Sequence, residues 1–308
     1  MPSFRELKRR IGGVKNIQQI TRAMKMVAGA RLRRAEQAIL ALRPYSSRLD
    51  AVCARFLAGA VGAEHPFLNE RPVRGVAVLT ITSDRGLCGA YNNRVVEATL
   101  DLLGERSAQR HFVIVVGHRG LSRLKSAGVE VYRSYEEVFN PVHFTAAQDI
   151  RSDVERLFLS REVDEAVAVF TEFFSPMRQL VVRRRLLPCS PARHAEQIKE
   201  HYDREVPYGV HFEPQEAQTG AEQVYIHEPD YQTICDRLLE YNVGVQIYRA
   251  LLEAQASEHG ARMVAMDNAT ENAEDMIADL TLTMNRVRQE SITREMLDVV
   301  GGAEAMRD

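Results

Sequence analysis

The fold is decided by the stretch from Tyr231 to Met306, which reads YQTICDRLLEYNVGVQIYRALLEAQASEHGARMVAMDNATENAEDMIADLTLTMNRVRQESITREMLDVVGGAEAM. Its apolar residues first recur at alternating steps of four and three: Ile234, Leu238, Tyr241, Val245, Tyr248 and Leu252. The rhythm slips by one residue at Ala256 and then resumes through Met263, Met266, Thr270, Ala273, Ile277, Leu280, Met284 and Val287. A period of 3.5 residues is typical of the seam of a left-handed coiled coil, and the slip indicates a stutter.

This stretch is too long to fold inside a compact body. No proline follows Pro229, and only Gly244 and Gly260 interrupt the run before Gly301. About 70 helical residues would extend ~105 Å at a rise of 1.5 Å per residue. A compact chain of 308 residues has a radius of gyration of only ~20 Å. We therefore expect the helix to project from its body and to need a partner along its length.

The segment from residue 3 to about residue 58 is predicted to be that partner. One apolar face carries Leu7, Ile11, Val14, Ile17, Met24 and Val27, and then Ala35, Ile39, Leu42, Leu49, Val52 and Phe56. Pro44 predicts a kink or a short break after Arg43, because proline removes a helical hydrogen bond. Two such arms at opposite ends of one chain, with a globular body between them, favour an antiparallel pair.

The charge distribution also favours pairing of the two arms. The net charge of the whole chain is only −2, but residues 1–58 carry 13 Lys and Arg against 3 Asp and Glu. Residues 228–308 carry 7 Lys and Arg against 16 Asp and Glu. Opposite charge on two helical segments indicates that they attract one another.

The middle of the chain has the pattern of an open α/β sheet. Strand-like runs are predicted at Val76–Thr82, Phe112–Val116, Val129–Tyr132, Glu165–Phe173 and Leu180–Leu187. Helical patterns lie between them, near Asn92–Leu103, Gly120–Ala127 and Thr145–Leu159. This alternation favours mainly parallel strands, while the short connection at residues 175–177 predicts an antiparallel hairpin at one edge.

The predicted fold class is therefore α/β, with a long antiparallel two-helix coiled coil from the two termini and a Rossmann-like open α/β domain. The expected boundaries are residues 1–58 for the N-terminal coiled-coil helix and 74–188 for the α/β domain. Residues 189–229 are expected to form a variable connecting segment and residues 230–308 the C-terminal coiled-coil helix.

Composition excludes several classes of protein. Hydrophobic residues make up 45% of the chain and charged residues 27%, as in ordinary globular proteins. No run of eighteen apolar residues is present, and the basic start MPSFRELKRR lacks the apolar core of a secretory signal, so neither a membrane span nor a signal is expected. The four cysteines form no CxxC pair, and the nine histidines show no HxxxH or HExxH spacing. We expect no metal, no cofactor and a reducing compartment.

One turn has the position of a phosphate-binding loop. SDRGLCGAYN (Ser83–Asn92) follows the first predicted strand and opens a helix, where backbone amides can receive an anion. It is not GxGxxG, and GxxxxGK[ST] is absent from the chain. A structural interpretation is favoured, in which Asp84 and Arg85 tie the turn and Gly86 and Gly89 permit close backbone approach. The GHRG turn at residues 117–120 has the same two interpretations, and Cys88 is expected to be a packed thiol.

Three separated motifs resemble one family. They are RRIGGVKNIQQITRAMKMVAGARLRRAE at 9–36, ITSDRGLCGAYN at 81–92, and SEHGARMVAMDNATENAEDMI at 257–277 with NRVRQESITREMLDVVGGAEA at 285–305. Together and in this order they resemble the gamma subunit of F-type ATP synthases. The resemblance implies a rotor shaft whose coiled coil lies inside a ring of alpha and beta subunits. It places the α/β domain at the foot, with the epsilon subunit on the membrane-embedded c-ring.

The resemblance also implies roles for single residues and a location. Arg288 and Gln289 match positions that hydrogen-bond a loop of a catalytic beta subunit, while Met24, Lys25 and Arg262 match positions tied to coupling efficiency. The chain itself would not be an enzyme and would be peripheral, on the cytoplasmic face of a bacterial inner membrane. Chloroplast members of the family carry an inserted cysteine pair for redox control. Here Cys189 stands alone in that neighbourhood, so no such switch is expected.

Two other classes of function remain open at the level of residues. The first is a nucleotide-binding α/β enzyme whose helical arms serve oligomerisation. The second is a coiled-coil scaffold or nucleic-acid binder that uses basic runs such as Arg31–Arg34, although no interleaved aromatic residues support it. The coupling ion, proton or sodium, is also left open.

Overall fold

The computed structural model describes residues 3–58, 65–189, 228 and 230–305. The chain divides into two compact units. The first unit holds residues 1–29 and 262–308, and the second holds residues 30–261. The predicted connecting segment 189–229 lies outside the described residues except for Cys189 and Glu228.

The second unit contains a five-stranded sheet of order β3-β2-β1-β4-β5. Its strands are β1 (Gly75–Ile81), β2 (Arg110–Val116), β3 (Val131–Tyr135), β4 (Glu165–Phe173) and β5 (Gln179–Leu187). The first four are mutually parallel, and β5 returns antiparallel to β4. Every residue of β1 and β4 is buried, as expected of central strands covered on both faces. The hairpin at the edge of the sheet, predicted from the short connection, is confirmed.

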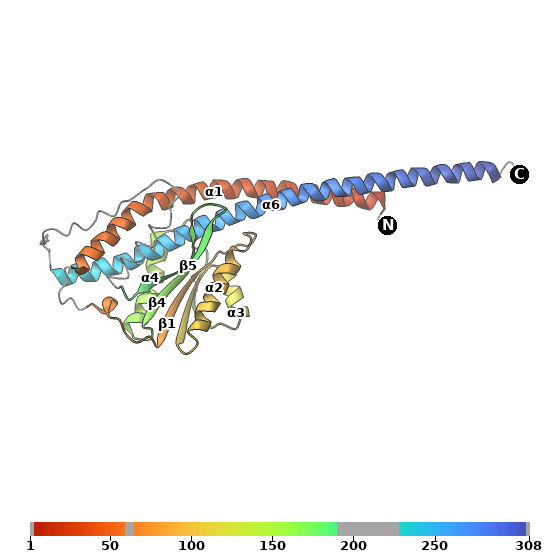
Figure 1. The fold of residues 1–308 in the computed structure, drawn as a ribbon. Coiled ribbons are helices and arrows are strands. Elements are labelled where there is room, and N and C mark those ends of the chain that lie inside the picture. The colour runs from red at the N-terminus through yellow and green to blue at the C-terminus, as the bar shows by residue number, and fades with distance from the viewer. Residues whose placement is uncertain (1–2, 59–64, 190–227, 229, 306–308) are drawn as a thin grey trace. The chain divides into compact units, whose positions relative to one another are not determined.

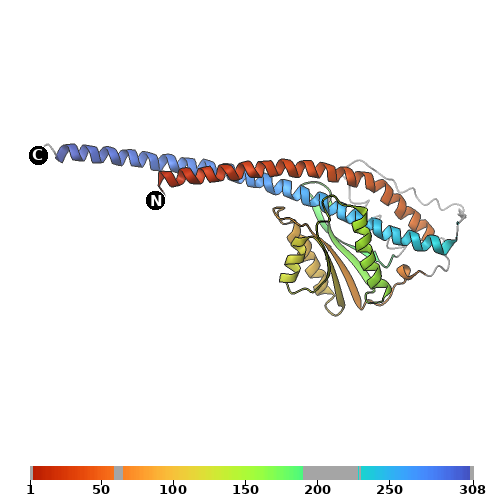
Figure 2. The same ribbon diagram turned by 180° about the vertical axis from the view of Figure 1, so that it is seen from behind.

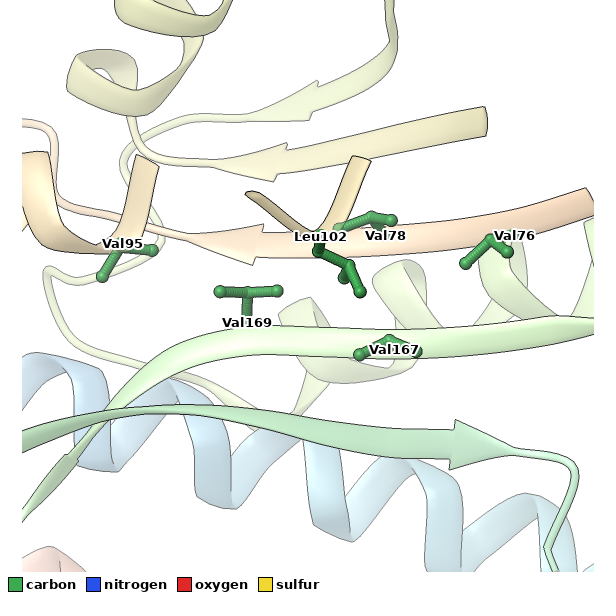
Figure 3. Packing of buried hydrophobic residues seen from close by; sticks show 6 residues of the cluster. All are labelled: Val76, Val78, Val95, Leu102, Val167 and Val169. Carbon is green, nitrogen blue, oxygen red and sulfur yellow. The ribbon is translucent and has the colours of Figure 1, made fainter. Parts of the chain in front are cut away.

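Helices cover both faces of this sheet (Figure 1). Helices α2 (Tyr91–Glu105) and α3 (His118–Ser126) lie on one face, and α4 (Phe144–Leu159) lies on the other beside the adjoining part of α6. Figure 3 shows the packing under α2, where Val95 and Leu102 meet valines from β1 and β4. Branched side chains at alternate strand positions fill this layer, which is why the helix packs there.

The first unit is a pair of antiparallel helical segments, from α1 (Phe4–Ala58) and α6 (Tyr231–Ala305). Gln18 contacts Glu274, Thr21 contacts Thr270 and Lys25 contacts Asp267, so the two partners run in opposite directions. On α6 the predicted seam is confirmed, because each of its positions from residue 263 to residue 287 is buried or half-buried.

On α1 the predicted seam is partly wrong. Ile17 and Val27 are exposed, while Thr21 and Ala28 are buried. The 3.5-residue rhythm that begins at Leu7 and Ile11 continues through polar residues, so following apolar residues alone leads to the wrong face. The polar seam is stable because its α6 partners are polar too.

In the second unit, α1 and α6 also lie side by side and antiparallel (Figures 1 and 2). The ring of Phe56 stacks on Tyr231 at 4.3 Å, and Asn242 donates a hydrogen bond to Asp50 at 3.0 Å. The predicted seam position Tyr241 is exposed here, whereas α6 is buried almost all round between residues 242 and 260. The sheet covers a second face of the helix there, so a single stripe does not describe it.

Of the kink or short break predicted at Pro44, the break does not occur, because α1 is helical from Phe4 to Ala58. Pro44 removes one backbone donor, and the packing of the helix on both sides of it outweighs this loss. Of the predicted strands, β3 begins two residues and ends three residues later than expected.

Candidate functional site

The turn after β1 is closed on itself. The side-chain oxygen of Asn92 accepts hydrogen bonds from the backbone N–H of Ser83 at 2.9 Å and from its hydroxyl at 3.0 Å. Cys88 is buried, and the Asn92 amide donates to its sulfur at 3.2 Å. Leu87 and Gly89 both have positive φ, 62° and 58°, which brings the chain back over Ser83. The turn therefore stabilises the start of α2 with its own side chains.

The N-terminus of α3 is used in the same way. Its first three N–H groups donate to the chain itself: His118 to Asp84 Oδ1 at 3.1 Å, Arg119 to the Ser83 carbonyl at 3.1 Å, and Gly120 to Thr82 Oγ1 at 3.0 Å. A Cβ at Gly120 would lie 2.3 Å from Thr82 Oγ1, and one at Gly117 would lie 2.4 Å from the Thr82 carbonyl.

These contacts decide what the N-terminus of α3 can do. The N–H groups that would cradle a phosphate there in a nucleotide-binding fold are satisfied by Thr82, Ser83 and Asp84. Asp84 lies where the turn motif places it, tying the turn to α3. Gly86 lies against the Arg119 guanidinium, so a Cβ there would be 3.1 Å from Nη2, and Arg85 is exposed. The geometry favours a joint between two βα units over an anion site.

The coil carries a ladder of polar contacts around Lys25, which we call the polar ladder: Gln18, Thr21, Arg22, Lys25, Asp267, Thr270 and Glu274. Glu274 Oε1 accepts from Gln18 at 2.8 Å and from Arg22 at 2.9 Å. The hydroxyls of Thr21 and Thr270 are 2.8 Å apart, and Lys25 pairs with Asp267. Paired polar groups at seam positions fix the register of a coiled coil.

The predicted coupling residues lie in and around this ladder. Lys25 is a member of it, with a half-exposed side chain, and the neighbouring Met24 is half-buried. Arg262 lies on α6 at the edge of the first unit and is buried. Thr270 was predicted as a seam position of α6, whereas the remaining members were missed because they are polar. Counting onward from Leu7 and Ile11 in steps of three and four would have found Gln18, Thr21 and Lys25.

Arg288 and Gln289, the residues expected to contact a beta subunit, are exposed on the outside of α6. Met284 and Val287, the seam residues just before them, are half-buried. Both side chains are therefore available to a partner, as helical geometry requires of at least one of them.

The cysteines have the environment of packed thiols. Cys53, Cys88 and Cys235 are buried, and Cys189 is partly so. Burial raises the pKa of the Cys53 and Cys189 thiols to about 12, which keeps them protonated and unreactive at neutral pH. Within the described ranges, no three His, Cys, Asp or Glu side chains are grouped to hold a metal ion. None of the helices in these ranges has the length and hydropathy needed to cross a bilayer.

The sequence is similar to known proteins along nearly its whole length. A family model described as ATP synthase matches residues 3–306. The ATP synthase gamma chain of Heliobacterium modesticaldum is 40% identical over 306 residues, covering 99% of this chain and 100% of that protein. The gamma chain of Desulforamulus reducens is 38% identical with the same coverage.

Solved structures show the same fold at lower identity. A chain of the Euglena gracilis mitochondrial ATP synthase, solved with F1 and the c-ring, superimposes with a TM-score of 0.66 at 18% identity, covering 98% of this chain and 94% of that one. A chain from the central stalk and c-ring of the Tetrahymena thermophila enzyme gives 0.59 at 22% identity, covering 81% and 99%.

Proposed function

The chain belongs to the ATP synthase gamma chain family, and from this premise we propose how its parts carry out the family's role. A gamma chain is the rotor shaft of an F-type ATP synthase and a non-catalytic subunit of its stalk. It links the turning of an ion-driven ring to conformational change in catalytic subunits. The coiled coil and the α/β domain would then serve the two ends of that link.

We assign the coil to the ring of alpha and beta subunits. Large apolar side chains are exposed near the end of α6: Ile292, Met296, Leu297, Val299 and Val300. Exposed apolar groups at this density favour a protein surface around them. Arg288 and Gln289 would bind a loop of a beta subunit, and Met24, Lys25 and Arg262 would tune coupling.

The α/β domain is assigned to the foot of the shaft, beside the epsilon subunit and on the c-ring. The chain would then be membrane-associated through its partners, on the cytoplasmic face of a bacterial inner membrane. The bacterial source of the 40% identical relative supports this location. The transported ion would be a proton or a sodium ion.

The mechanism follows from asymmetry. A shaft made of two unlike helices presents a different face to each catalytic subunit as it turns. Each face stabilises one conformation of that subunit more than the other, and so shifts its population between open and closed states. The shaft needs no active site of its own, in agreement with the N-terminus of α3, whose first three amide groups donate within the chain.

The observation that carries this proposal is the match along nearly the whole chain, both arms included. Co-expression with the cognate alpha and beta subunits tests it. We expect a stable complex that contains the chain and hydrolyses ATP, with alpha and beta expressed alone as the control. Failure of the chain to join alpha and beta subunits that themselves associate would contradict the assignment.

A further inference from the structure

A buried carboxylate of α6 is held by two other elements of the second unit. Glu253 has none of its surface exposed. Its Oε2 accepts the backbone N–H of Phe173, the last residue of β4, at 3.1 Å. Its Oε1 accepts a hydrogen bond from Arg43 of α1 at 3.3 Å, and Arg43 also donates to the Phe173 carbonyl at 3.4 Å. One ion pair thus holds both backbone polar groups of one strand residue.

A second carboxylate extends this arrangement. Glu172 is buried and accepts from Arg184 of β5 at 3.3 Å. Arg249, one turn before Glu253 on α6, lies 4.0 Å from Glu172 and 3.9 Å from Glu253. Burial and the neighbouring Arg249 lower the pKa of Arg184, while the carboxylates of Glu172, Glu253 and Asp50 favour its charged form. The buried ion cluster, defined as Arg43, Glu172, Arg184, Arg249 and Glu253, joins α1, α6, β4 and β5.

Stability alone does not account for such a cluster. Burying charges is costly, and apolar side chains of similar volume often hold a protein together equally well. Hydrogen-bonded ions fix the position of one element on another, because their geometry is satisfied at one position only. Apolar burial is non-directional and does not fix a position in this way. This difference matters here because most of the side chains that α6 buries nearby are apolar, among them Ala250, Leu251 and Ala254. Apolar contacts alone do not select one position of the helix, since they carry no directional bonds.

We propose that Arg43 and Glu253 are positioning residues that lock the adjoining parts of α1 and α6 to the end of β4, so that the α/β domain and these helices turn as one body. This inference rests on the proposed rotor function and adds the residues through which torque passes. Without the lock, part of each turn of the domain would be lost as slip along α6.

The substitution Glu253→Gln tests the lock with little change in shape. The amide oxygen of the glutamine still accepts from Phe173, but its NH₂ group faces the Arg43 guanidinium, donor against donor. The matched control is Glu105→Gln, which removes an exposed ion pair with Arg183 of β5 whose N–O distance is 2.8 Å. A second variant, Arg43→Met with Glu253→Met, replaces the pair by apolar side chains and protects the test against simple misfolding.

Two measurements are made on each variant. The first is hydrogen exchange of the Phe173 amide in the full chain, expected to be about tenfold faster in both Glu253 variants, the factor that about 1.4 kcal/mol produces. The second is the number of ions pumped per ATP hydrolysed by the assembled complex, expected to fall in both Glu253 variants while hydrolysis continues. Glu105→Gln should match the unmodified protein in both.

If the hydrogen-exchange rate of the Phe173 amide is unchanged in the Glu253 variants, the proposed lock is overturned. This holds even if the number of ions pumped per ATP falls. Full coupling in a folded Arg43→Met, Glu253→Met complex also overturns it, because the pair would then only fill space. Failure of the rotor function gives a different result: the unmodified chain would form no coupled complex, while the exchange measurement would still report on the lock.

Discussion

At the scale of single residues, Arg288 and Gln289 are the sharpest test of a partner contact. Both are exposed on α6, next to a half-buried seam. A charge-assisted hydrogen bond from Arg288 to a beta subunit would contribute about 1.5–3 kcal/mol, enough to bias a conformational equilibrium tenfold or more. We predict that Arg288→Ala with Gln289→Ala impairs coupled synthesis and hydrolysis of ATP and leaves the complex assembled.

The matched control for this pair is Arg286→Ala, an exposed arginine two positions earlier and therefore on another side of the helix. Turnover and ion pumping are measured on purified complexes of both variants. Rates in the double variant equal to those of the unmodified complex would show that neither residue holds a rotary position.

Glu155 gives a pH-dependent prediction at the same scale. Burial raises its carboxyl pKa from 4.5 to about 7, although Arg151 lies 3.4 Å away. Between these pH values the folded chain holds a proton that the unfolded chain releases. The contribution of this group to stability is therefore complete below about pH 4.5 and is lost as the pH rises through about 7.

Glu155→Gln removes this titration. The variant should unfold at a higher temperature than the unmodified chain at pH 8, with a smaller difference at pH 5. The exposed Glu162→Gln serves as the control, with no change expected at either pH. A difference in melting temperature that is the same at both pH values would contradict the raised pKa.

At the scale of elements, periodicity correctly predicted the features that depend on apolar residues alone. These are the α6 seam from residue 263 to residue 287 and the five strands. The polar ladder was missed because Thr21 and Lys25 sit at seam positions whose stability depends on partners some 250 residues away in sequence. The burial of α6 on several faces near Glu253 was missed for a related reason, since only the tertiary structure reveals that the sheet covers it.

Two glycines, Gly13 and Gly117, allow the effect of helix propensity on stability to be compared with the effect of tertiary contacts. Gly13 lies in the exposed part of α1 with nothing within 4 Å of an added Cβ, so Gly13→Ala should stabilise the isolated chain by about 1 kcal/mol. Gly117 has φ +95°, and a Cβ added there would lie less than 3 Å from backbone atoms of Thr82 and Ser83. Gly117→Ala should therefore destabilise the α/β domain by more than Gly13→Ala stabilises α1.

Denaturant unfolding, followed by circular dichroism for the helices and by near-ultraviolet signals for the domain, checks both glycine variants. An unchanged stability of the α/β domain in Gly117→Ala would mean that the joint between the turns after β1 and β2 is looser than these contacts indicate.

At the scale of the whole molecule, the proposed function gives the coil and the α/β domain different roles. A coil with a polar seam and exposed outer residues suits a surrounding ring of subunits. An α/β domain whose first two βα turns are hydrogen-bonded to each other suits a mechanical foot. The turn motif that looks like a phosphate loop shows why position on a fold does not establish function. Its Ser83 and Asp84 accept from the first N–H groups of α3, which the motif alone could not reveal.

The most direct test of the rotor assignment is single-molecule rotation. The alpha–beta ring is fixed to a surface, and a bead is attached through a cysteine introduced at Arg85, an exposed position of the α/β domain. We predict continuous rotation of the bead in one direction when ATP is supplied, and none without ATP. A complex that contains the chain and hydrolyses ATP while the bead stays still would contradict the rotor function.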